Sequence, residues 1–233
     1  MPAISDEIPI LTVPTVLFPG TFLPVQVTDD AQRKLLRDCL SAGRRLGVIL
    51  SPDARHASRS SIPFTTGCLA SVTLLAHSGD ENSEEPLQAM LFGKQRMRVL
   101  DLLQQKPYLT GRIEQLDDQH GANIARRTEQ VARIFAQYLA VIGEYYDTEV
   151  DDITLPHDPT MASYMLASVL YLPAVLKQRW LESASTALRL DEEQRYLAME
   201  CEKHTALLRL SQYADQRFSP PDHRLYLTLT SQN

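Results

Sequence analysis

The feature that most constrains the fold of this chain is a change in the spacing of its apolar residues near residue 119. Before that point, short apolar or alternating segments are separated by turn residues at close intervals, which is typical of β-strands. After it, apolar residues recur about every 3.6 positions, the period of an α-helix. We therefore expect an α+β protein with a β domain over residues 1–118, a helical domain over 119–215 and a C-terminal tail over 216–233.

Short strands dominate the predicted first half, and a single helix interrupts them. The strands are expected at 7–13, 21–27, 45–50, 66–77, 87–93, 96–104 and 108–116. In the helix, Asp29 is placed as the N-cap, Gln32 follows as in a capping box, and Gly43 ends the helical pattern. This arrangement favours a small, partly closed barrel.

Four helices are predicted in the second half. They are expected at 124–143, 159–170, 174–183 and 185–213. Asp158 and Pro159 form an N-cap followed by proline at the first helical position, which is a common helix start. The tail contains "LYLTLT" (225–230), whose alternation suits an edge strand.

The segment "TVLFPGTFLPVQV" (15–27) reads as strand material but contains three residues that interrupt strands. Pro19 and Gly20 predict a tight turn, because proline fixes φ and glycine adopts positive φ without strain. Pro24 has no N–H for a sheet ladder, so its strand should be an edge strand or contain a bulge.

Composition and charge narrow the classes of function. The chain has 23 basic and 29 acidic side chains and a net charge of −6, which disfavours a nucleic-acid partner. Its N-terminus lacks the pattern of a signal peptide, no apolar run is long enough to cross a membrane, and its three cysteines are far apart. We expect a cytoplasmic protein with reduced thiols and no membrane association.

Motifs for catalysis, cofactors and metals are absent or incomplete. The Gly93-Lys94 pair lacks the other residues of a phosphate-binding loop, and no dinucleotide, hydrolase or zinc-protease signature occurs. Cys201 and His204 lie one helical turn apart without a second ligand pair, and a core cysteine beside a core-edge histidine is the commoner arrangement. The acidic segment 147–158 lacks the glycine and the final glutamate of a calcium loop. We expect no enzyme activity, no cofactor and no metal, although a hydrolase site built from distant residues stays open.

Three segments together resemble a known family. "IPILTVPTVLFPGTFLPVQV" (8–27) is similar to the opening of the Lon protease N-terminal, substrate-binding domain. "LFGKQRMRVLDLLQQKPYLTGRIEQLDD" (91–118) resembles two later strands of that family, with Gly93, Arg96, Pro107, Tyr108 and Glu114 at matching places. "LPAVLKQRWLESASTALRL" (172–190) resembles a segment of its helical part.

The resemblance implies a PUA-like pseudo-barrel followed by a helical bundle, and a role in selecting unfolded or tagged proteins. Members of the family continue into ATPase and peptidase domains, which this sequence does not contain, so we expect a stand-alone, non-enzymatic homologue. Its expected partners are unfolded or exposed protein segments and a separate protease or ATPase chain, for which it would be an adaptor or a regulator.

A hydrophobic groove with an open strand edge would suit extended peptides. The residues expected to form the apolar patch are Leu17, Phe18, Pro19 and Phe22. The alternative is that Phe18 and Phe22 pack inside the barrel and Pro19-Gly20 only reverses the chain. An RNA-binding accessory domain is the alternative function, because PUA-like barrels include RNA binders, but the acidic balance disfavours it.

Overall fold

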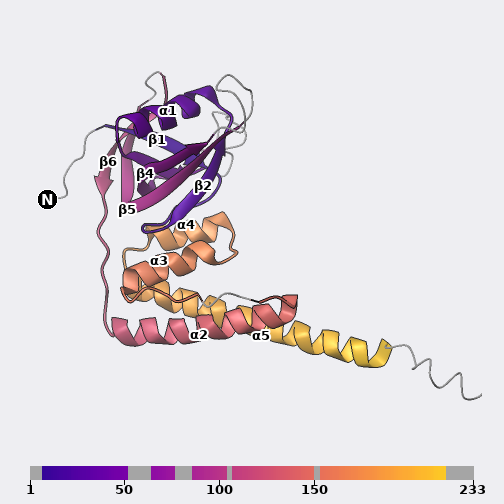
Figure 1. Cartoon of the computed structure of the whole chain (residues 1–233). Coiled ribbons are helices and arrows are strands. Elements are labelled where there is room, and N and C mark those ends of the chain that lie inside the picture. Colours follow the sequence, from indigo (N-terminus) through magenta and orange to yellow (C-terminus); the bar gives the residue numbers. More distant parts are fainter. Residues whose placement is uncertain (1–6, 52–63, 77–85, 104–106, 150–152, 219–233) are drawn as a thin grey trace, which may run out of the picture. The chain divides into compact units, whose positions relative to one another are not determined.

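The computed structural model of the chain describes residues 7–51, 64–76, 86–103, 107–149 and 153–218 (Figure 1). The chain packs into two compact units, of which the first comprises residues 1–129 and 155–193 and the second comprises 130–154 and 194–233. The helices α2 (Ile124–Tyr146) and α5 (Thr186–Phe218) each contribute to both units. The predicted domain limits at 118/119 and 215/216 stay a prediction, and most of the predicted tail, including "LYLTLT", lies outside the described residues.

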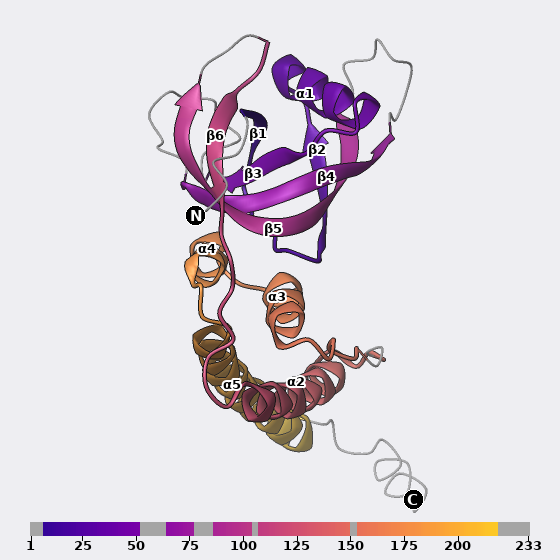
Figure 2. The same ribbon diagram turned by 90° about the vertical axis from the view of Figure 1, so that its left-hand side faces the viewer.

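The first unit is built around one mixed sheet. Its strands are β1 (Ile8–Val13), β2 (Phe22–Val27), β3 (Leu46–Leu50), β4 (Thr66–Ala76), β5 (Leu87–Leu103) and β6 (Thr110–Gln115). Strands β1 and β3 are parallel, and the other pairs are antiparallel. The sheet order is β2-β5-β4-β3-β1-β6, and β6 also pairs with β5. That additional pairing closes a ring of five strands, so the predicted α+β class with a pseudo-barrel is confirmed (Figure 2).

The strands predicted at 87–93 and 96–104 are a single long strand, β5, and the prediction of two strands was wrong. Its first half pairs with β2 and its second half with β6, while β4 follows most of its length on the other side. Register shifts in the β4–β5 ladder let the strand bend, as β-bulges do. Gly93 therefore marks a close approach of another segment to β5, and not the end of a strand.

The helix α1 (Asp30–Ser41) packs against the sheet beside the main core of the barrel (Figure 2). The carboxylate of Asp29 accepts a hydrogen bond from the Gln32 backbone N–H, as the N-cap prediction requires. Gly43 follows the helix with a φ of 59°, in the left-handed region that favours glycine. Leu35, Leu36 and Cys39 form the buried face of α1.

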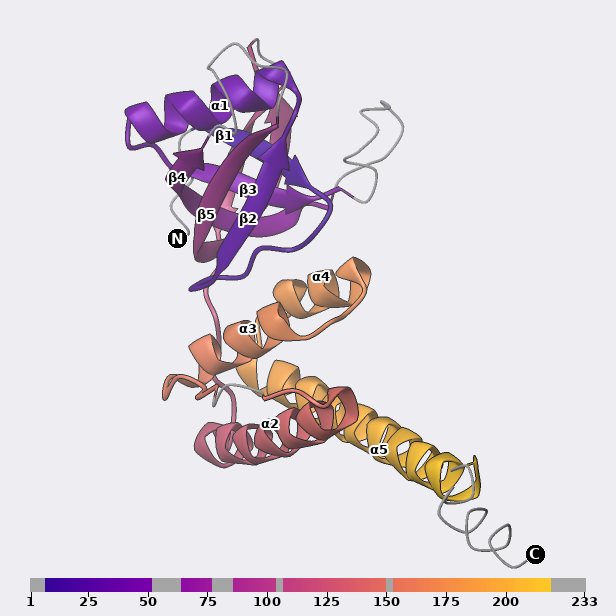
Figure 3. The ribbon, with the colours of Figure 1, turned by 45° about the vertical axis from the view of Figure 1, so that its right-hand side comes forward.

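The helices α3 (Pro159–Val169) and α4 (Ala174–Glu182) also belong to the first unit (Figure 3). Asp158 caps α3 by accepting a hydrogen bond from the Met161 backbone N–H, and Pro159 opens the helix as predicted. The side chain of Gln178 in α4 donates to the backbone carbonyl of Thr66 in β4. This contact fixes α4 against the sheet.

The second unit consists of the later turns of α2 and α5. Val131 and Phe135 are the buried residues of α2, and Leu197 and His204 of α5 are buried as well. The ring of His204 lies edge-on to Tyr138 of α2, with 6.5 Å between the ring centroids. An apolar and aromatic seam therefore holds these two helices together.

Candidate functional site

The Phe-Pro-Gly segment forms a tight turn between β1 and β2. The backbone N–H and the hydroxyl of Thr21 both donate to the carbonyl of Phe18, at 3.3 and 2.9 Å. Gly20 has a φ of 75°, which is the conformation that the sequence predicts for this position. The turn is tied to β5, because Gly20 donates to the carbonyl of Gly93 and Gly93 donates to the carbonyl of Thr21.

This turn is buried against α3 and β5. The rings of Phe18 and Tyr164 lie 5.9 Å apart, and a Cβ atom added to Gly20 would come within 2.7 Å of the Met161 sulfur. A Cβ atom added to Gly93 would lie 2.1 Å from the Phe18 carbonyl oxygen, a distance that no side chain tolerates. The matching glycines of the sequence therefore let the turn pass closely over β5 and under α3.

The four residues of the predicted binding patch lie in different environments. Leu17, Phe18 and Pro19 are buried, whereas Phe22 is 62% exposed. The structure thus leaves Phe22 as the member of the set that a partner could reach. That these residues bind a peptide stays a prediction.

Phe22 belongs to an exposed apolar surface that the sequence prediction did not include as a whole. The pairing registers place Phe22 opposite Phe92, Pro24 opposite Met90, and Leu74 opposite Met90 on the other side of β5. Paired residues of neighbouring strands point to the same side of a sheet. We call this surface the outer apolar face, and it consists of Phe22, Pro24, Leu74, Met90 and Phe92.

Aromatic contacts organise the outer apolar face. The rings of Phe22 and Phe92 are 4.8 Å apart, and the ammonium of Lys94 lies 4.5 Å from the centroid of the Phe92 ring. Leu74 is 58% exposed. In contrast, Leu23 and Val25 on the opposite side of β2 pack against the barrel core. The strand therefore has one side in the core and one apolar side on the surface.

Strand β2 ends the sheet, which is one of the two arrangements predicted from Pro24, an edge strand or a bulge. Among the described residues, β2 pairs with β5 on one side and with no strand on the other (Figure 3). The carbonyl of Met90, opposite Pro24, accepts a hydrogen bond from Thr73 of β4 and so points away from β2. In an antiparallel pair, a residue at such a position forms no backbone hydrogen bond with the partner strand. Pro24 therefore removes no hydrogen bond from the sheet. The backbone groups of Phe22, Pro24 and Gln26 face the open edge, and the missing N–H of Pro24 lies there too.

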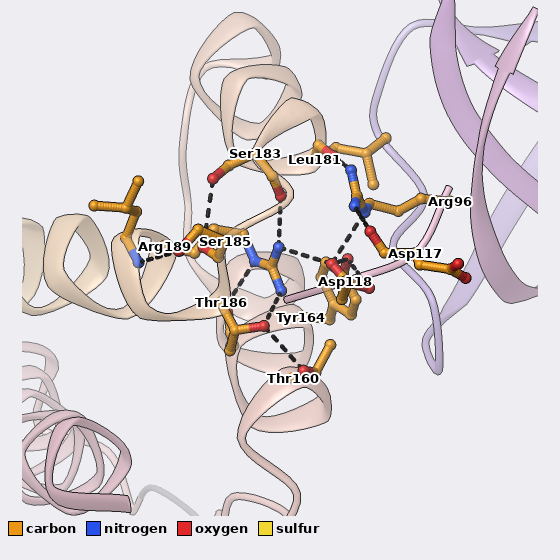
Figure 4. Close-up of polar contacts among 12 residues, drawn as sticks. Arg96, Asp117, Asp118, Thr160, Tyr164, Leu181, Ser183, Ser185, Thr186 and Arg189 are labelled. Carbon is orange, nitrogen blue, oxygen red and sulfur yellow. Dashed lines mark hydrogen bonds and ion pairs between the residues drawn. The ribbon is translucent and has the colours of Figure 1, made fainter. Parts of the chain in front are cut away.

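A largely buried ion network is centred on Asp118 (Figure 4), and it adjoins the Phe-Pro-Gly turn through the contact between Tyr164 and Phe18. The carboxylate of Asp118 accepts hydrogen bonds from Arg96 of β5 at 3.1 Å, from Arg189 of α5 at 3.0 Å and from the Tyr164 hydroxyl of α3 at 2.7 Å. Both arginines are 1% exposed. Arg96 also donates to the backbone carbonyls of Asp117 and Leu181.

Asp118 follows β6, so the network ties the barrel to three helices of the same unit. The guanidinium of Arg189 stacks 4.3 Å from the centre of the Tyr164 ring. Burial raises the pKa of the Tyr164 phenol, which remains a hydrogen-bond donor at neutral pH. The sequence identifies Arg96 as part of the Gly-x-x-Arg element that resembles the family. The spacing of residues along the sequence does not predict that Arg96 contacts Asp118 or lies near Arg189.

Of the residues considered for metal binding, those that the structure describes are not gathered into a site. In the described ranges, no three His, Cys, Asp or Glu side chains are arranged to hold a metal ion. His204 instead contacts the Glu200 carbonyl through Nδ1 at 2.9 Å. Residues 150–152 of the acidic segment lie outside the described part of the chain. Within that part, no helix has both the length and the apolar composition needed to cross a bilayer.

Residues 7–199 match the family described as the ATP-dependent protease La (LON) substrate-binding domain. The match extends from the first strand into α5 and thus covers most of the chain. This chain belongs to the Lon substrate-binding domain family. The resemblance read from the Phe-Pro-Gly and Gly-x-x-Arg elements is confirmed, and both elements of this Lon domain meet in the buried turn described above.

Lon proteases are the relatives that align with this Lon domain. Lon protease of Anaeromyxobacter dehalogenans (strain 2CP-C) is 26% identical over 197 residues, which cover 82% of this chain and 22% of that protein. Lon protease of Koribacter versatilis (strain Ellin345) is 25% identical over 231 residues, covering 96% of this chain and 28% of that protein. The chain thus spans about a quarter of the length of these relatives.

Two solved structures share the fold of this Lon domain. The N-terminal domain of the Mycobacterium avium complex Lon protease aligns with a TM-score of 0.63 at 18% identity, covering 85% of this chain and 100% of that one. A Lon N-terminal domain protein from Xanthomonas campestris aligns with a TM-score of 0.56 at 19% identity, covering 81% and 96%. At this level of identity the comparison supports the architecture alone.

Proposed function

We propose that this Lon-family domain is a non-enzymatic protein-binding module that holds extended, apolar segments of other proteins at the outer apolar face. The single observation that carries the proposal is the exposure of an apolar surface beside an open strand edge. Phe22 and Leu74 are more than half exposed, although each could be polar without cost to the core. A contiguous apolar patch on a protein surface is typical of an interaction site.

The open edge of β2 offers a second means of recognition. The backbone N–H of Gln26 and the carbonyls of Phe22 and Pro24 face outward, where an added strand would meet them. Main-chain hydrogen bonds of this kind are indifferent to sequence, whereas alternate side chains of the added strand would reach the apolar face. A protein segment must be unfolded or exposed to bind in this way, because folded proteins already use these groups internally.

The binding role connects with proteolysis through the family. The relatives are Lon proteases, and the matched family is described by substrate binding. We therefore place the module in protein quality control, where it presents bound segments to a protease or ATPase chain or withholds them as a regulator. Crosslinking in cells followed by mass spectrometry separates these roles, because an adaptor is captured with both a protease and its substrates.

The proposal is tested with two fluorescein-labelled peptides, one of alternating Val and Thr residues and one in which Ser replaces every Val. Fluorescence anisotropy should show binding of the first peptide and at least tenfold weaker binding of the second. Leu74→Ser should weaken binding of the first peptide, because it makes the outer apolar face more polar. Leu100→Ser is the matched control, since Leu100 is 47% exposed on β5 but outside the outer apolar face.

Gln26→Pro tests the strand edge separately from the apolar face. It removes an outward N–H without breaking a bond to β5, so the free energy of unfolding should change little while peptide binding weakens. Equal binding of both peptides, or equal effects of Leu74→Ser and Leu100→Ser, would refute the proposed site. Intact binding in Gln26→Pro with weakened binding in Leu74→Ser would retain the apolar face and remove the added-strand geometry.

A further inference from the structure

Glu193 is a buried acid that forms no ion pair with any of the described residues. It lies on α5 and is 0% exposed. The Ser163 hydroxyl on α3 donates to its Oε1 atom at 2.8 Å. Its Oε2 atom has no hydrogen-bond partner among the described residues. A carboxylate in such surroundings is costly, because bulk solvent does not reach it and a single hydroxyl donates to it among the described residues.

Arg189, one turn earlier on α5, is committed to other acceptors. Its Nη1 atom donates to Asp118 at 3.0 Å and to the Ser183 carbonyl at 2.6 Å. Its Nη2 atom donates to Thr186, and its Nε atom donates to the Ser163 hydroxyl at 3.1 Å. The Ser163 hydroxyl therefore accepts a hydrogen bond from Arg189 and donates one to Glu193, which links the two side chains.

The charged and titratable groups of this network come from α3, α4, α5 and β5. Glu192, beside it on α5, accepts hydrogen bonds from Arg179 and Trp180 of α4. From α3, Tyr164 binds Asp118, and from β5, Arg96 binds Asp118 as well. The carboxylate of Asp118 is thus shared by the guanidiniums of Arg96 and Arg189, while Glu192 adds negative charge close to Glu193.

These surroundings favour the neutral form of Glu193. Burial is the largest cause and raises the pKa of Glu193 to about 8, and the charge of Glu192 acts in the same direction. The hydrogen bond from Ser163 and the charge of Arg189 lower the pKa and offset part of the rise. The side chain therefore exchanges its proton close to neutral pH.

We propose that Glu193, Ser163, Arg189 and Asp118 form a proton-dependent latch within the first unit. With Glu193 neutral, Arg189 pairs with Asp118 and holds the link after β6 against α3 and α5. When Glu193 loses its proton to solvent, it competes with Asp118 for Arg189, and the ion pair between Arg189 and Asp118 weakens, while Asp118 keeps its hydrogen bonds from Arg96 and Tyr164. The protonation of one buried acid thereby sets the strength of the link between α5 and the segment that follows β6.

Trp180 reports on this latch, because it is the only tryptophan of the chain and is bonded to Glu192, the neighbour of Glu193. Its emission should change with pH with a midpoint near 8 in the wild type. Glu193→Gln keeps the shape of the side chain and should abolish the transition. Glu202→Gln, an exposed position on the same helix, is the matched control and should leave it unchanged.

The free energy of unfolding should also depend on the protonation of Glu193. The folded pKa of Glu193 is raised, so its stabilising effect is complete below the ordinary glutamate pKa and is lost as pH rises toward 8. The melting temperature of the wild type should therefore fall relative to Glu193→Gln across that range and stop falling above it. A flat profile, or an equal slope in both proteins, would overturn the proposal.

Hydrogen exchange in the wild-type chain tests whether Asp118 and Glu193 compete for Arg189. Hydrogen exchange of the Gln119 amide, which donates to the Ala184 carbonyl, is measured at pH 6.5 and 9 and corrected for intrinsic rates. Protection should fall at the higher pH in the wild type and persist in Glu193→Gln. If Asp118→Asn folds, the pH midpoint of its Trp180 emission change should fall by at least one pH unit, because Arg189 can then pair with Glu193. Unchanged protection in the wild type would reject the latch.

Discussion

Phe18 and Phe22 are four residues apart in one apolar segment, yet the structure gives them opposite environments. Phe18 is fully buried between β5 and α3, whereas Phe22 is 62% exposed on the outer apolar face. The difference shows that the family-like motif has two parts. The Phe-Pro-Gly turn is buried and joins the barrel to α3, and the strand that follows it presents apolar side chains to solvent.

The buried half of the motif is held by partners far away in the sequence. Tyr164 and Met161 on α3 contact the turn, and Gly93 on β5 lies beneath it. Among the described strands, the exposed half pairs with β5 alone, so one edge of β2 has no partner strand. Substitutions should therefore separate stability from binding along this segment, and the predictions below run from the largest expected effect to the smallest.

Phe18→Ala should have the largest effect on stability. It removes a fully buried ring from the joint between the barrel and α3, so we expect the free energy of unfolding to fall by about 3–5 kcal/mol. Chemical denaturation of the full chain measures this loss. A decrease below about 1 kcal/mol would show that the turn does not support the first unit as described.

Local sequence patterns predicted the elements that depend on local chemistry. Some features could be predicted because each follows from the dihedral or hydrogen-bonding properties of one residue. They are the turn at Gly20, the N-caps at Asp29 and Asp158 and the edge position of Pro24. The single strand β5 was not readable. Glycine in a strand usually weakens it, and only the approach of the Phe18 carbonyl explains why Gly93 lies within one.

The candidate site could be predicted only in part, because burial depends on distant partners. No residue near Phe18 in the sequence indicates that α3 covers its ring. The outer apolar face likewise requires the register of three strands, which places Leu74 and Phe92 around Met90. Asp118, Arg96 and Arg189 come from three separate segments, so no motif could have joined them.

Arg96→Met compared with Arg98→Met should separate buried from exposed ion pairs on the same strand. Arg96 is buried and donates to Asp118 and two backbone carbonyls, so its loss should cost about 2–4 kcal/mol of the free energy of unfolding. Arg98 pairs with Glu114 at the surface, and its loss should cost less than about 1 kcal/mol. Equal losses would contradict the anchoring role of Arg96.

Gly93→Ala should have an intermediate effect, since the added methyl group would meet the Phe18 carbonyl oxygen at 2.1 Å. Either the turn or β5 must shift, which should lower the free energy of unfolding by about 1–3 kcal/mol. In Gly111→Ala the closest atom would be 3.0 Å away, so that variant should lose less. Thermal melts of the two variants provide the comparison, and a greater loss in Gly111→Ala would contradict it.

Phe22→Ala should have the smallest effect on stability and a clear effect on binding. Its ring is mostly exposed and contacts Phe92, so we expect the free energy of unfolding to fall by less than about 1 kcal/mol. An exposed ring that anchors a bound segment contributes more to the complex than to the fold, and removing such an anchor costs about 2 kcal/mol or more of binding free energy. The dissociation constant for the Val-Thr peptide should therefore rise more than tenfold in a protein that melts almost as the wild type does. If Phe22→Ala destabilised the protein as much as Phe18→Ala does and left binding unchanged, both phenylalanines would be structural and the contrast between them would disappear.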